Sequence, residues 1–101
     1  MSATSALALA DTLDRVRRVV AIELLAGAEA AEYVDDDLDH GVGTRAVYEA
    51  VREPVDPLEG DRPLDGDIDA ISAQLDDGTQ QKRVADRLDE GFADRTDGGT
   101  A

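Results

Sequence analysis

The stretch VVAIELLAGAEAA at residues 19–31 sets how this chain folds, because it is apolar on nearly every side of a helix. It lies within a longer segment, about residues 4–34, in which apolar residues recur at steps of three and four. This spacing places the following residues in one stripe along a helix: Leu9, Leu13, Val16, Val20, Leu24, Gly27 and Ala31. We therefore predict one long N-terminal helix.

The predicted helix carries more apolar surface than the rest of the chain can cover. At 1.5 Å per residue it is roughly 45 Å long, and only 67 residues follow residue 34. Glycine and alanine dominate residues 26–31, which lets neighbouring helices approach closely. We therefore predict that this helix packs against partners that lie outside the sequence.

Three shorter helices are predicted after the long one, at about residues 44–53, 67–77 and 80–90. Residues 54–66 contain three prolines and two glycines, which predicts an ordered loop. Nothing reads as a strand, so the predicted fold class is all-α, with one long N-terminal helix followed by short helices and loops. Residues 91–101 are predicted to be a disordered tail.

Capping residues and apolar faces support the three shorter helices. The expected capping residues are Gly43 or Thr44 and Asp65 or Asp67 at N-termini, and Pro54 and Gly78 at C-termini. The expected apolar faces are Val47, Tyr48 and Val51, then Ile68, Ile71 and Leu75, and finally Val84 and Leu88.

The composition excludes several classes of function. The chain has 101 residues, 24 acidic and 10 basic side chains, a formal charge of −14 and no cysteine. An acidic chain is a poor partner for nucleic acid or for an anionic membrane surface. The absence of cysteine excludes disulfides, thiolate metal sites and a cysteine nucleophile. Its 17 aspartates and single lysine are typical of salt-adapted, halophilic proteins.

The N-terminal residues predict a cytoplasmic protein. Residues 1–10 contain no basic side chain, which a secretory signal requires before its apolar stretch. The apolar run at residues 19–31 contains two glutamates and is shorter than the roughly 20 residues that a membrane-spanning helix needs. We therefore expect a soluble protein with no membrane partner.

Two motifs resemble ligand-binding loops but lack essential parts. GVGTRA at residues 41–46 matches a glycine-rich phosphate loop, which requires a buried strand immediately before it, and residues 35–40 cannot form one. Asp65, Asp67 and Asp69 resemble the start of a calcium loop, but the glycine and the final glutamate are missing. We interpret the glycines as helix breakers and the aspartates as residues of a helix N-terminus.

Isolated polar residues do not form a catalytic site. His40 is the only histidine, so no histidine pair for a metal and no serine–histidine system can form. Burial of Glu23 in the apolar run could raise its pKa and suit it to proton transfer, but an ion pair or cap contact with a neighbouring helix is the interpretation we favour. Tyr33 and Tyr48 are expected to pack. We assign no catalytic, cofactor-binding or metal-binding residue.

Three sets of residues follow one another along residues 1–77: RVVAIELL at 18–25 with the alanine-rich stretch after it, Gly43-Thr44 with Tyr48, Val51 and Arg52, and Leu58 with DRPL at 61–64 and Asp67-Ile68. In these residues and in their order the chain resembles the aromatic amino-acid ammonia-lyases, and histidine ammonia-lyase in particular. Together with the salt-adapted composition, they resemble the C-terminal portion of a haloarchaeal histidine ammonia-lyase.

The resemblance implies a homotetramer of long, nearly parallel helices that eliminates ammonia from L-histidine to give urocanate, in histidine degradation. The family uses a methylidene-imidazolone electrophile made from an internal Ala-Ser-Gly triad. That triad is absent here, because Ser2, Ser5 and Ser72 are each followed by alanine. The catalytic tyrosine, the substrate-binding groups and a late glutamate of the family align before Met1. The resemblance therefore places no catalytic residue and no cofactor in this chain.

We predict that residues 1–90 are the C-terminal helical region of this carbon–nitrogen lyase, with a role in structure and assembly and no activity alone. The expected partners are the remainder of the lyase polypeptide and the homotetramer. Two alternatives stay open: a stand-alone acidic helical interaction protein, and the same portion of a phenylalanine or tyrosine ammonia-lyase, since the specificity-determining residues also lie upstream.

Overall fold

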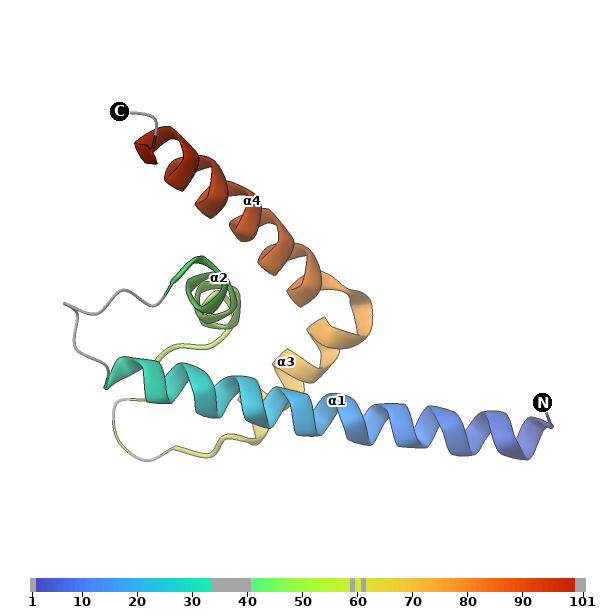
Figure 1. Ribbon diagram of the computed structural model, residues 1–101. Helices are drawn as coiled ribbons and strands as arrows, with labels where there is room; N and C mark the ends of the chain where they lie inside the picture. Colours follow the sequence, from blue (N-terminus) through green and yellow to red (C-terminus); the bar gives the residue numbers. More distant parts are fainter. Residues whose placement is uncertain (1, 34–40, 59, 61, 100–101) are drawn as a thin grey trace.

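The computed structural model describes residues 2–33, 41–58, 60 and 62–99, and over them it is an all-α protein without strands (Figure 1). Its four helices are α1 (Ala3–Glu32), α2 (Gly41–Arg52), α3 (Asp65–Asp77) and α4 (Thr79–Gly99). The predicted fold class and the long N-terminal helix are confirmed. Ser2 caps α1, because its hydroxyl accepts a hydrogen bond from the Ser5 N–H at 3.1 Å.

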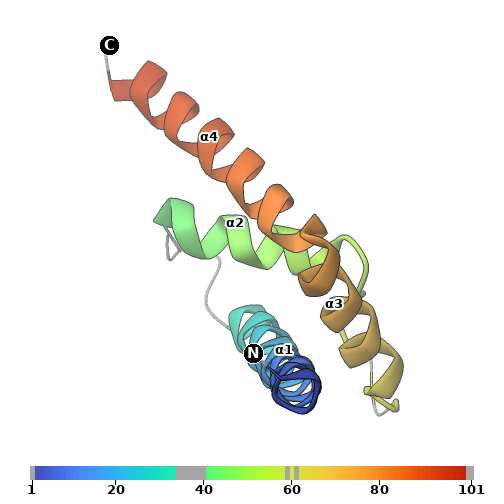
Figure 2. The same ribbon diagram turned by 90° about the vertical axis from the view of Figure 1, so that its right-hand side faces the viewer.

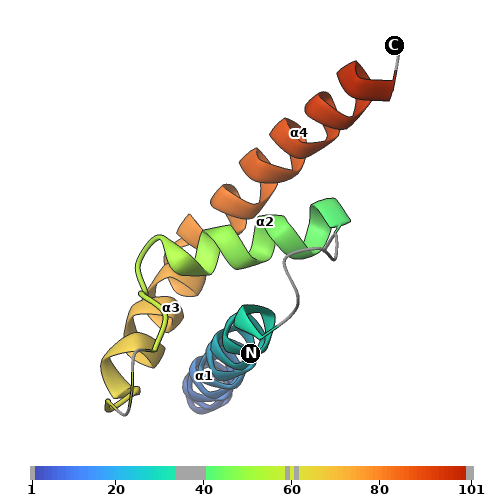
Figure 3. The same cartoon turned by 90° about the vertical axis from the view of Figure 1, so that its left-hand side faces the viewer.

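The four helices form a thin layer in which much of α1 stays open. The molecule measures 59 × 36 × 16 Å, and a helix with its side chains is already about 10–12 Å across. Helix α1 packs against α2 and α3, while α4 packs against α2 and α3. Figure 2 looks along α1 from its N-terminal end and shows α2 and α3 on adjacent sides of it. Figure 3 shows α4 crossing α2 and running away from α1.

A small core lies where α1, α2, α3 and the loop after α2 meet. Its buried members are Ala21, Leu25, Ala28, Val51, Val55 and Ile71, with Leu24, Val47, Tyr48, Ile68 and Leu75 packed around them. The apolar faces predicted for the second and third helices are therefore confirmed. Among the residues whose burial the structure describes, only Ile71 and Val51 are large and fully buried, so the core is thin for a chain of this length.

Helix α2 begins earlier than its sequence predicts. It starts at Gly41 rather than near residue 44, so Gly43 and Thr44 lie inside its first turn and do not cap it. Gly41 has φ of +76°, a left-handed conformation that glycine adopts without steric cost. The chain therefore turns into α2 at Gly41.

Helix α3 also begins slightly early, at Asp65. Leu64 is its N-cap and makes no side-chain capping hydrogen bond, so the prediction of Asp65 or Asp67 as the cap is wrong. Both aspartates lie in the first turn instead, where they interact favourably with the helix dipole. Gly78 ends the helix with φ of +84°, which confirms its predicted role.

Helix α4 continues to Gly99, well past its predicted end near residue 90. The sequence predicts a disordered tail over residues 91–101, whereas the structure describes residues 91–99 as helix, and residues 100–101 lie outside the described residues. Helix α4 packs closely against α2 at Gly91: a Cβ atom placed on Gly91 would lie 2.7 Å from Cγ1 of Val42. This close approach between the two helices is tertiary and has no local sequence signal.

None of the helices in the described ranges is long and apolar enough to cross a membrane.

Candidate functional site

The surface most open to a partner is the apolar stripe predicted on α1. We call Leu9, Leu13, Val16, Val20, Leu24, Gly27 and Ala31 the α1 stripe. Its first four members are between 39% and 51% exposed. The face of α1 that packs inside the chain is a different one, formed by Ala21, Leu25 and Ala28. At 3.6 residues per turn the centres of the two faces lie roughly 100° apart around the helix.

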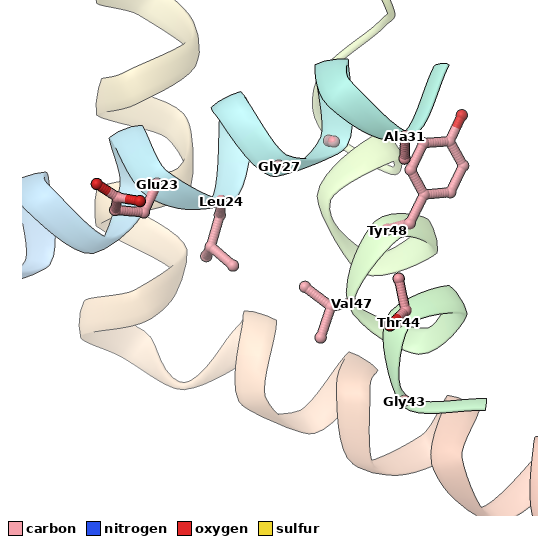
Figure 4. A pocket seen from close by; sticks show the side chains of 9 residues that line it. Glu23, Leu24, Gly27, Ala31, Gly43, Thr44, Val47 and Tyr48 are labelled. Carbon is pink, nitrogen blue, oxygen red and sulfur yellow. The ribbon is translucent and has the colours of Figure 1, made fainter. Parts of the chain in front are cut away.

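The α1 stripe ends in a hollow between α1 and α2, the α1–α2 hollow. It encloses about 520 Å³ and is lined by Glu23, Leu24, Gly27, Ala28, Ala31, Gly43, Thr44, Val47 and Tyr48. Figure 4 shows Leu24 and Val47 pointing toward one another across it, with the Tyr48 ring beside Ala31 at one end. Most of the lining is apolar, which suits the hollow to aliphatic side chains.

Glu23 lies at the end of the hollow away from Tyr48 (Figure 4). Its side chain is exposed, so the burial that a proton-transfer role requires is absent. It has no hydrogen bond or ion pair with any residue that the structure describes. The contact of Glu23 with a neighbouring helix stays a prediction.

Arg52 is the centre of a polar cluster at the junction of α1, α2 and the following loop. Its Nη2 lies 2.9 Å from Glu29 Oε1 and 3.2 Å from Glu32 Oε1. The Leu58 N–H donates to Glu29 Oε1 at 3.1 Å, and the Tyr48 hydroxyl donates to Glu32 Oε1. The Tyr48 ring centre lies 5.5 Å from Arg52 Cζ, which adds a cation–π contact.

The electrostatics of this cluster favour its charged, paired form. Partial burial opposes ionisation of Glu29, but the hydrogen bonds from Arg52 and Leu58, with the charges of Arg52 and Arg62, outweigh it and lower the pKa of Glu29. The hydrogen bond to the Glu32 carboxylate, together with burial, raises the pKa of Tyr48. Tyr48 therefore keeps its proton and donates a hydrogen bond to Glu32, which is a structural role beyond the packing predicted for it.

The remaining sequence candidates do not assemble into a chemical site. GVGTRA forms the start of α2, and His40 lies outside the described residues. Asp67 pairs with Arg62 at 3.0 Å and Asp69 with Arg18 at 2.8 Å, so two of the three aspartates face arginines. Over the described ranges no three histidine or acidic side chains could hold a metal together.

Tyr33 and Arg52 depart from what the sequence predicts. Tyr33 is 87% exposed, so it does not pack against the described part of the chain as expected. The sequence singles out Arg52 only through the family resemblance and does not predict its pairing with Glu29. A glutamate inside a predicted apolar run is the signal that could have suggested such a pair, but the partner of Glu29 is 23 residues away.

Comparison with known proteins relates the chain to one segment of the histidine ammonia-lyases. A probable histidine ammonia-lyase of Halobacterium salinarum is 39% identical over 93 residues, which are 92% of this chain and 18% of that protein. The histidine ammonia-lyase of Symbiobacterium thermophilum is 44% identical over 78 residues, 77% of this chain and 15% of that protein. A probable histidine ammonia-lyase of Thermoplasma acidophilum is 41% identical over 76 residues, 75% of this chain and 15% of that protein.

The chain thus spans less than a fifth of the length of these relatives. No family model and no solved structure matches it. The predicted resemblance to histidine ammonia-lyase, including haloarchaeal forms, is confirmed as a partial match.

Proposed function

Because the chain is related to one segment of the histidine ammonia-lyases, we propose that it is the C-terminal helical portion of such an enzyme, with a role in structure and assembly. The match carries this proposal: three relatives with that name share 39–44% of the aligned residues over three quarters or more of the chain. The exposed α1 stripe supports it, because a helix taken from a larger bundle leaves such a face uncovered.

The complete enzyme would be a carbon–nitrogen lyase that eliminates ammonia from L-histidine to give urocanate. It would work in the cytoplasm, in a salt-adapted host, as a homotetramer. This chain would supply no reacting group. It has no Ala-Ser-Gly triad from which the family's electrophile forms, and the α1–α2 hollow offers mostly apolar walls. The residues present therefore do not fit that electrophile, and no step is assigned to them.

Complementation tests this proposal. The partner is the Halobacterium salinarum enzyme shortened by the segment that this chain matches. Urocanate formation from L-histidine is followed in molar KCl for the chain, for the shortened enzyme and for their mixture. Activity is expected only in the mixture, because the chain lacks the triad from which the electrophile forms and the shortened enzyme lacks the segment that this chain matches. Urocanate made by the chain alone, or no association between the two parts, would contradict the proposal.

The DNA immediately upstream of the Met1 codon separates this proposal from the stand-alone alternative. An adjoining reading frame that encodes an Ala-Ser-Gly triad supports a lyase portion. An unrelated gene or a promoter there favours an acidic helical interaction protein that shares only descent with the lyases.

A further inference from the structure

We propose that the α1 stripe and the α1–α2 hollow receive one long helix of the remaining lyase polypeptide, and that this helix carries an arginine or lysine that pairs with Glu23. The inference rests on the proposed function, and it specifies the chemistry of the partner. It is supported by the shape of the apolar surface, by the free carboxylate beside it and by the charge of the chain.

The shape of the surface requires a long partner. From Leu9 to Ala31 the stripe runs for about 33 Å at 1.5 Å per residue. Its spacing is four, three and four residues from Leu9 to Val20, and the same again from Val20 to Ala31. This 11-residue repeat stays close to the natural period of an α-helix, so a second helix can follow the stripe along its whole length. A small molecule would cover only a fraction of it.

The hollow gives the end of that helix a place to pack. Gly27, Ala31 and Gly43 leave room between α1 and α2, so aliphatic side chains of the partner can enter it. A polar small ligand would need several converging hydrogen-bond groups to orient it. The Tyr48 hydroxyl already donates to Glu32 and is therefore committed to another partner.

Glu23 is the acid of α1 that is left unpaired in the described part of the chain. The other four are each held by an arginine: Asp11 by Arg15, Asp14 by Arg17, and Glu29 and Glu32 by Arg52. By helical geometry Glu23 lies about 60° from the centre of the stripe, on the side away from the buried face. A helix that covers the stripe removes water from this carboxylate, which is costly unless a cation pairs with it.

The charge of the chain argues that the occupant is not a second copy. Two copies would bring together two chains of charge −14 and two unpaired Glu23 carboxylates. The arginines of α1 are already engaged, since Arg15 pairs with Asp11, and Arg17 and Arg18 also reach Asp76 and Asp69 of α3. A partner helix that carries an arginine or lysine avoids both the repulsion between two acidic chains and the burial of unpaired Glu23 carboxylates.

Binding of variants to the shortened Halobacterium salinarum enzyme tests the inference. The labelled full chain is titrated with that enzyme in molar KCl, and helix content is checked by circular dichroism. Leu13→Asp should weaken binding about 100-fold, because it places a charge in the covered stripe. The matched control Leu7→Asp changes a leucine that is 73% exposed and lies off the stripe, and should change binding less than about twofold.

The same titration tests the predicted ion pair between Glu23 and a cation of the partner. Glu23→Lys should weaken binding about 10-fold and Glu23→Gln about threefold, in line with loss of a partly desolvated ion pair. Asp11→Lys makes the same change of charge on the opposite side of α1 and should have less than about a twofold effect. An arginine-to-glutamate or lysine-to-glutamate change in the partner that restores binding to the Glu23→Lys variant would identify the cation.

The other outcomes overturn the inference. If Leu13→Asp weakens binding but Glu23→Lys leaves it unchanged, the pairing of Glu23 with a cation is refuted. If neither variant changes binding, the α1 stripe is not the contact surface, while the proposed function stands. A dimer of the isolated chain that Leu13→Asp dissociates assigns the surface to a second copy instead. Absence of any binding by the unmodified chain removes the proposed function and the inference together.

Discussion

Gly91 offers a sharp test of the packing between α2 and α4. Alanine is favoured over glycine inside a helix by about 1 kcal/mol, so local reasoning expects Gly91→Ala to stabilise α4. In the structure, however, the added Cβ would lie 2.7 Å from Val42 Cγ1. Because valine is stiff about χ1, relieving this contact should cost about 1–3 kcal/mol. We therefore expect Gly91→Ala to lower the free energy of unfolding by about 0–2 kcal/mol.

Gly27→Ala is the matched control, because Gly27 is also inside a helix but nothing lies within 4 Å of the place that its added Cβ would take. It should raise the free energy of unfolding by about 1 kcal/mol. The measurement is urea unfolding in molar KCl, followed by circular dichroism of the helices. The variants are Gly91→Ala, Val42→Ala and the double variant.

The double-mutant cycle isolates the contact. In the Val42→Ala background the obstructing methyl group is gone, so Gly91→Ala should now be stabilising, with a coupling free energy of about 1–3 kcal/mol between the two sites. If Gly91→Ala stabilises the unmodified chain as much as Gly27→Ala does, then α4 does not approach α2 as closely as described.

Three further predictions concern the Arg52 cluster and the core, all measured by urea unfolding. Glu29→Gln should cost about 1–3 kcal/mol, because it weakens charged hydrogen bonds to a nearly buried guanidinium, whereas Asp11→Asn, in an exposed pair, should cost less than about 0.5 kcal/mol; equal effects would contradict the structural role of the cluster. The folded-state pKa of Glu29 lies below its ordinary value of 4.5. The contribution of the Glu29 carboxylate to the free energy of unfolding is therefore complete above that ordinary value and is lost as the pH falls through the lower, folded-state value. Acid should consequently lower the urea midpoint less in Glu29→Gln than in the unmodified chain. Ile71→Ala should cost about 2–5 kcal/mol, since Ile71 is fully buried, and a cost as small as that of Leu7→Ala would place Ile71 outside the core.

The apolar surface of the candidate site could be predicted from the sequence, but its polar detail could not. The α1 stripe follows from residue spacing along one helix, and its expected need for an outside partner agrees with the exposure of Val16 and Val20. The α1–α2 hollow depends on how α2 crosses α1, and the isolation of Glu23 depends on which acids the arginines reach. The hollow and the pairs of Arg18 with Asp69 and of Arg52 with Glu29 join segments far apart in sequence, which spacing does not relate.

The order of residues along the chain is enough to establish that it forms helices, where their apolar faces lie, and that the long helix has more apolar surface than the chain can bury. These properties are local, since each depends on residues three or four positions apart. The packing of the helices was needed to establish that Ala21, Leu25 and Ala28 form the inner face of α1, that Gly91 lets α4 pack closely on α2, and that Arg52 holds Glu29. Periodicity identifies apolar faces, but which face the same chain covers depends on how the helices are placed in space.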